Sequence, residues 1–117
     1  MNADDRLNRA FSALADPTRR AILTRLAQGP ATVQEVAEPF RMSAPAISRH
    51  LKVLEQAELV TRTAHAQWRT LSLQAEPLDE VSAWISQQRS EWNLRLDALE
   101  QHLETLKEKD KDDDHTP

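Results

Sequence analysis

Residues 42–60 read MSAPAISRHLKVLEQAELV, and they contain a helix start signal followed by a regular apolar pattern. Ser43 is a residue type that caps helix N-termini through its side-chain oxygen, and Pro45 is tolerated in a first helical turn. The apolar residues that follow stand at spacings of four and three, on one face of a helix: Ile47, Leu51 and Leu54. The stretch therefore predicts an amphipathic helix that begins near Ser43 and ends at about Ala57.

The opposite face of this helix carries small, hydroxyl and cationic side chains, which suit contact with the phosphates and base edges of DNA. Arg49 is the candidate for reading a base, because its fork fits the two acceptors of guanine. His50 has two open interpretations, a phosphate contact or a hydrogen-bonded residue at the helix interface. The predicted DNA-binding residues of this segment, some of them phosphate contacts that set the register, are Arg41, Ser43, Ala44, Pro45, Ser48, Arg49, His50 and Lys52.

Three helices are predicted before this stretch. Apolar residues at helical spacing indicate a first helix over about residues 4–14. Asp16, followed by a proline, is a start signal for a second helix, which a Gly-Pro pair at 29–30 ends. Thr32 is the expected cap of a short third helix, which Pro39 stops.

The period of the apolar residues changes from 3.6 to 2 after the fourth helix. Residues 59–63 and 69–73 are short runs rich in Val, Thr and Leu, and they predict a β-hairpin. Arg62 and Arg69 on this hairpin are further predicted DNA contacts. Two short helices with a tight connection, followed by a hairpin, are typical of a winged helix-turn-helix, whose second helix enters the major groove of DNA.

A long last helix is predicted from Pro77 onward. The side chains at one position in seven are apolar, which is typical of a helix that packs along a partner helix: Ile85, Trp92, Leu99 and Leu106. Residues 107–117 contain no apolar side chain and are expected to lack regular structure. The predicted fold is mainly α with a small β-hairpin, divided into a winged helix-turn-helix at 1–75, a C-terminal dimerisation helix at 76–106 and a charged tail at 107–117.

The charge is unevenly divided along the chain. Residues 1–75 carry ten Lys/Arg against seven Asp/Glu, a balance of +3, whereas residues 76–117 carry five against twelve, a balance of −7. These give the net charge of −4. Because salt screens exposed charges beyond about 8 Å, the acidic C-terminal part leaves a DNA-binding surface elsewhere possible.

Several classes of function find no support in the sequence. The chain has no cysteine, which excludes disulfides and thiolate metal sites, and its single glycine provides no phosphate-binding loop. We expect no catalytic residues, no metal site and no cofactor, and therefore no enzyme. No apolar run approaches the ~20 residues needed to span a bilayer and the N-terminus is polar, so a cytoplasmic protein is expected.

Three stretches together resemble a known family. The segments ALADPTRRAILTRLAQGP (13–30), MSAPAISRHLKVLEQAELV (42–60) and the following hairpin are similar to the arsenic-repressor (ArsR/SmtB) family of winged-helix regulators, over about Phe11 to Leu73. The spacing of Ser43, Ser48 and His50 matches the family pattern. Residues 77–104 are similar to the metal-independent branch, with its long last helix rich in Trp and Leu.

The resemblance implies a homodimer built from the first and last helices, which binds an inverted repeat in duplex DNA, represses transcription and is released by a signal, from a small molecule or a protein, that the sequence does not identify. The implied interface residues are Leu7, Phe11, Val81, Ile85, Trp92, Leu96, Leu99 and Leu103. Glu58 departs from the family, which usually has Gly there. The alternatives left open are a protein-interaction module acting through the last helix, a metal sensor, and activation of transcription instead of repression.

Overall fold

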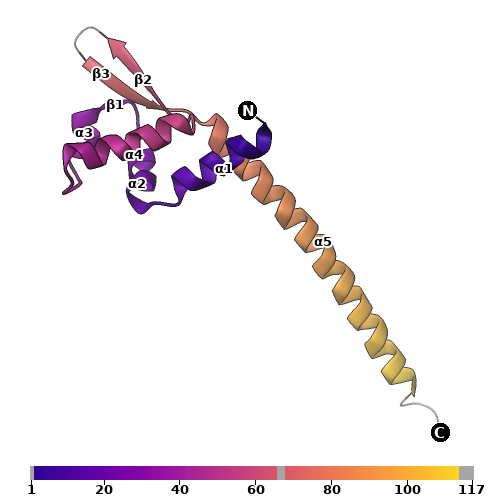
Figure 1. Ribbon diagram of the computed structural model, residues 1–117. Helices are drawn as coiled ribbons and strands as arrows, with labels where there is room; N and C mark the ends of the chain where they lie inside the picture. Colours follow the sequence, from indigo (N-terminus) through magenta and orange to yellow (C-terminus); the bar gives the residue numbers. More distant parts are fainter. Residues whose placement is uncertain (1, 66–67, 114–117) are drawn as a thin grey trace. The chain divides into compact units, whose positions relative to one another are not determined.

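Helices α1 to α4 precede the hairpin in the computed structural model, which describes residues 2–65 and 68–113 (Figure 1). The helices are α1 (Ala3–Leu14), α2 (Pro17–Leu26), α3 (Val33–Ala37), α4 (Ala44–Gln56) and α5 (Glu76–Asp113). The strands are β1 (Ala31–Thr32), β2 (Val60–His65) and β3 (Trp68–Leu73). The order α3, α4, β2, β3 confirms the predicted winged helix-turn-helix.

The chain divides into two compact units, one that ends at Ser82 and one that begins at Ala83. The first unit contains α1 to α4, the described strands and the first turns of α5. The second contains the rest of α5. The sequence placed a boundary at residue 75, immediately before α5 begins.

The sheet has the strand order β1-β3-β2, and both pairings are antiparallel. Leu71 of β3 lies opposite Ala31 on one side and Arg62 on the other. The sequence predicted β2 and β3 but not β1. A strand of two residues is too short to show a period of two, so its existence depends on the neighbouring strand β3 and not on its own pattern.

The predicted helix caps are confirmed at three places. The Asp16 carboxylate accepts hydrogen bonds from the amides of Thr18, at 2.8 Å, and Arg19, at 3.2 Å. Thr32 and Glu35 form a reciprocal capping box at the start of α3. The Ser43 hydroxyl accepts from the amide of Ala46 at 3.3 Å. Each cap satisfies amides that the first turn of a helix leaves without a partner.

One apolar core lies between the helices and the sheet of the first unit. Helix α4 contributes the three side chains that the sequence predicted as inward, and residues of α1, α2, α3 and the strands pack with them. Burial of each such aliphatic side chain contributes about 1.5–3 kcal/mol. The fully buried large side chains are Ile22, Val36, Ile47, Leu51, Leu54, Leu59, Val60 and Leu71.

Helix α4 ends in a Schellman motif. This motif determines where the wing, which is the hairpin of β2 and β3, begins. The amide of Leu59 donates to the carbonyl of Leu54 and the amide of Glu58 donates to that of Glu55, both at 3.0 Å. Leu54 and Leu59 are both buried in the core. Glu58 adopts a φ of 60°, the left-handed region that favours glycine. The departure from the family pattern at this residue therefore falls on a strained backbone position.

We expect Glu58→Gly to raise the free energy of unfolding by about 0.5–1 kcal/mol. The left-handed conformation costs a residue with a Cβ about 1–2 kcal/mol, and the greater freedom of glycine in the unfolded chain offsets part of that gain. Denaturant unfolding measures the difference. Glu58→Ala removes the same charge but keeps the Cβ, so an equal gain in both variants would contradict backbone strain as the cause.

Helix α5 continues to Asp113, whereas the sequence predicted a tail without regular structure from Lys107. Lys and Glu are good helix formers, and Glu104 and Lys107 stand at the favourable spacing of three. Local propensity therefore extends the helix past its last apolar residue, Leu106. Residues 114–117 of that predicted tail lie outside the described part of the chain. Among the described helices, none is both long enough and apolar enough to cross a membrane.

Candidate nucleic-acid interface

Helix α4 presents two chemically different faces. Its inward residues are buried in the core. The predicted DNA-binding residues on the other side are all exposed, and the exposed set is Ser43, Ala44, Pro45, Ser48, Arg49 and Lys52. Within residues 2–65 and 68–113, neither Arg49 nor Lys52 has an ion pair. The small side chains at the start of the helix permit close approach, and the two free cations follow within the next two turns.

Arg41 lies in the connection between α3 and α4 and is exposed. It precedes the cap residue Ser43 by two positions, so its charge stands close to the helix start. The N-terminus of a helix carries partial positive charge from its unpaired amides. The start of α4 therefore combines a cationic side chain with the positive end of a helix dipole, and both favour an anion.

His50 is set apart from this exposed group. Its Nδ1 lies 3.9 Å from Oδ1 of Asp16 and 3.4 Å from Nη1 of Arg19, and its side chain is 18% exposed. The sequence left two interpretations open for His50. This position favours a hydrogen-bonded residue at the helix interface over a phosphate contact. Arg19 continues the network, because its guanidinium donates to the carbonyls of Ser12, at 2.8 Å, and Ala13, at 2.7 Å.

The same network changes the pKa of the Asp16 carboxyl group. Desolvation would raise its pKa, but the amide hydrogen bonds from Arg19 and Thr18 and the charges of His50 and Arg19 together lower the pKa below its ordinary value. Asp16 thus stays ionised at neutral pH as the cap of α2. The network fixes α4 against α1 and α2 through His50, which immediately follows the proposed base-reading residue Arg49.

The two wing arginines share one face of the sheet. Arg62 lies opposite Leu71, and Arg69 lies opposite Ala64, so both arginines lie on the same face as the buried residues Val60 and Leu71, further along the strands. Arg69 is exposed and has no ion pair among the described residues. Arg62 differs, because its Nε donates to Oε1 of Glu55 on α4. The sequence did not single out Glu55, since a contact between a helix and the following strand leaves no periodic signal.

The predicted interface residues of α5 form an exposed apolar stripe in the second unit. Leu99 is 53% exposed, and the other large apolar side chains along the stripe are exposed as well. Val81 differs, because it is 7% exposed and lies buried within its own unit. In α1, Leu7 is half-buried and Phe11 is exposed. The exposed members of the stripe are Ile85, Trp92, Leu96, Leu99, Leu103 and Leu106.

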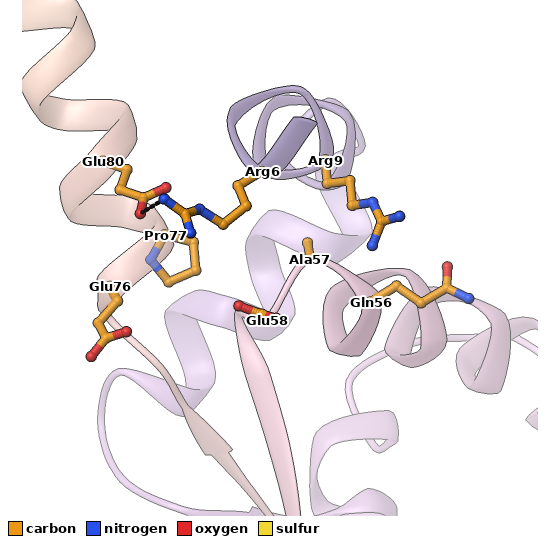
Figure 2. Close-up of a pocket in the computed structure, with 8 residues that line it drawn as sticks. All are labelled: Arg6, Arg9, Gln56, Ala57, Glu58, Glu76, Pro77 and Glu80. Atoms are coloured by element: carbon orange, nitrogen blue, oxygen red, sulfur yellow. Dashed lines mark ion pairs between the residues drawn. The ribbon is translucent and has the colours of Figure 1, made fainter. Parts of the chain in front are cut away.

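A small pocket of about 70 Å³ lies where α1, the end of α4 and the first turn of α5 meet (Figure 2). Arg6 reaches across it to Glu80, with 3.5 Å between Nη2 and Oε1. Arg9 and Glu58 also line it. No pattern in the sequence indicated this site, because its lining comes from the ends of three separate elements. The pocket is too small for a drug-sized ligand, whose sites measure about 300–1,000 Å³.

Comparisons with known proteins agree with this geometry. A family model described as a helix-turn-helix domain matches residues 14–63. The transcriptional repressor SdpR of Bacillus subtilis (strain 168) is 39% identical over 79 residues, which are 68% of this chain and 88% of SdpR. An arsenical resistance operon repressor of Staphylococcus xylosus is 33% identical over 76 residues, 65% of this chain and 73% of that repressor.

One similar solved structure is that of a protein whose family is known. The crystal structure of an ArsR family transcriptional regulator is similar with a TM-score of 0.73 and 42% identity, over 77% of this chain and 93% of the other. The chain belongs to the ArsR family. As an ArsR family protein with a winged helix-turn-helix, it is a DNA-binding transcriptional regulator.

The range that the helix-turn-helix model matches contains most of the predicted DNA-binding residues. The matched range 14–63 includes each predicted DNA-binding residue except Arg69. The matched range ends before α5, so the family model says nothing about the apolar stripe of that helix. Within the described residues, no three His, Cys, Asp or Glu side chains lie close enough together to hold a metal ion.

Proposed function

We propose that this ArsR family protein is a homodimeric repressor that binds an inverted-repeat operator in the cytoplasm. The observation that carries the proposal is the two-faced helix α4, which buries Ile47, Leu51 and Leu54 and leaves Arg49 and Lys52 exposed without ion partners in the described chain. This side of α4 enters the major groove, and Arg49 reads a base there. Arg41, Arg62 and Arg69 contact phosphates beside it.

The proposed dimer pairs the apolar stripe of α5 with the same stripe of a second copy. Large exposed apolar patches are typical of surfaces that bind another protein. A stripe with a repeat of seven fits a second helix of the same kind. In such a dimer the two α4 helices enter successive major grooves about 34 Å apart, so the proposed operator has two inverted half-sites.

Arg49→Ala is expected to weaken binding by about 1–3 kcal/mol, because a bidentate contact to guanine contributes that much discrimination. The probe is a labelled duplex that the protein itself selects from a random-sequence pool, and fluorescence anisotropy at several salt concentrations measures its affinity. The logarithm of the binding constant should fall steeply and linearly with the logarithm of the salt concentration.

Arg9→Ala is the matched control for this experiment. Arg9 is an exposed arginine on α1, so its removal changes the net charge equally but leaves α4 intact. We expect it to retain nearly all of the affinity. Equal losses in the two variants, or an affinity that salt does not change, would contradict the proposed surface and favour a protein-interaction module acting through α5.

A further inference from the structure

The ion pair between Glu55 and Arg62 joins the proposed recognition helix to the wing. Oε1 of Glu55 accepts from Nε of Arg62, and the two side chains are about one-third exposed. Ser48, Lys52 and Glu55 follow one another at spacings of four and three, so they form one row along α4. The row that starts with a hydroxyl and a cation thus ends in a carboxylate.

A carboxylate at this place needs an explanation. DNA is a polyanion, and a bare negative charge beside it lowers affinity. A partly exposed ion pair also contributes little to folding stability, so stability alone is a weak reason for Glu55. Arg62 is one of the two hairpin residues predicted to contact DNA, and Glu55 forms an ion pair with it.

The geometry of the pair suggests a role in binding. An arginine side chain carries five N–H donors, one on Nε and four on the two terminal nitrogens. Glu55 uses Nε, while the terminal nitrogens have no hydrogen bond to any described residue. A guanidinium held in this way keeps its outer edge available for a phosphate. It also loses less side-chain freedom on binding, because it is already ordered.

We propose that Glu55 is a positioning residue for DNA binding, which holds Arg62 of the wing by Nε and directs its terminal nitrogens toward a backbone phosphate. This inference rests on the proposed function, since it takes α4 and the wing as the DNA-binding surface. It adds a role for an acidic residue within that surface. Its consequence has an unusual sign, because removal of a negative charge should weaken binding to a polyanion.

The test is the affinity of Glu55→Gln for the selected duplex. Simple electrostatics predicts that this variant binds more tightly. The positioning role predicts binding about threefold to tenfold weaker, because the neutral amide of Gln accepts a weaker hydrogen bond from Arg62 than the carboxylate does. It also predicts that the slope of log binding constant against log salt falls by about one, because one phosphate contact is lost. Affinity equal to or above that of the unchanged protein, with the same slope, would overturn the proposal.

Glu58→Gln is the matched control, because it removes an identical charge three residues further along. Among the described residues Glu58 has no ion pair. The control should bind with unchanged or slightly higher affinity. A loss equal to that of Glu55→Gln would show that the effect is not specific to the Arg62 pair and would overturn the proposal.

A double-mutant cycle separates positioning from a merely structural role. Arg62→Gln should reproduce the loss and the lower slope, and Glu55→Gln combined with Arg62→Gln should be no weaker than Arg62→Gln alone. Additive losses would overturn the proposal. If Arg49→Ala retains full affinity, the proposed function itself fails and this inference fails with it. If Arg49→Ala weakens binding but Glu55→Gln does not, the positioning role alone is wrong.

Discussion

Leu99→Glu is expected to convert the proposed dimer into monomers and to lower the affinity for the selected duplex by at least about 100-fold. The substitution places a carboxylate in the centre of an apolar seam, and burial of an unpaired charge costs several kcal/mol in each copy. A monomer then engages one half-site at a time and loses the gain of linked binding, which is about 10²–10⁴. Sedimentation velocity measures the mass, and anisotropy measures the affinity.

Leu94→Glu is the matched control for this experiment. Leu94 is 69% exposed and stands two residues from both Trp92 and Leu96, which places it on the opposite side of α5 from the stripe. The same substitution there should leave the dimer and the affinity unchanged. A Leu99→Glu variant that stays dimeric would exclude the stripe as the interface. If both variants are monomeric, the assignment of Leu99 and Leu94 to opposite faces of α5 is wrong.

The features that sequence could predict are those that neighbouring residues determine. Asp16, Thr32 and Ser43 cap helices through amides two or three residues away, so a short window contains the whole interaction. The buried face of α4 follows from residue spacing for the same reason. Together these local signals predicted α2, α3 and α4. Because they predicted which face of α4 is buried, they also predicted which face is exposed.

The features that sequence missed depend on side chains brought together by the fold. Arg19 and Arg20 belong to α2 but donate to carbonyls at the end of α1, including that of Leu14 at 2.7 Å from Arg20. The last four carbonyls of a helix lack the regular intrahelical amide partner, and these arginines supply donors there. The pair of Glu55 with Arg62 is of the same kind. No spacing rule connects such residues, because the turn between two elements decides which side chains meet.

The second large effect concerns the inner side of α4. Leu54→Ala is expected to lower the free energy of unfolding by about 2–5 kcal/mol, because it removes buried methyl groups and leaves a cavity that the core fills only in part. Leu54 is fully buried, and its carbonyl accepts the bond from Leu59 that ends the helix. Loss of that magnitude is a large part of the stability of a small domain.

Leu94→Ala makes the same substitution at an exposed position of α5 and should change the stability by less than about 0.5 kcal/mol. Urea unfolding of both variants, at one protein concentration because a dimer's stability depends on it, measures the difference. The comparison also bears on DNA binding, since Arg49 and Lys52 are exposed because Leu51 and Leu54 are buried on the other side of the same helix. Equal stabilities of the two variants would mean that α4 does not bury this face, and the orientation on which the DNA-binding surface depends would then be wrong.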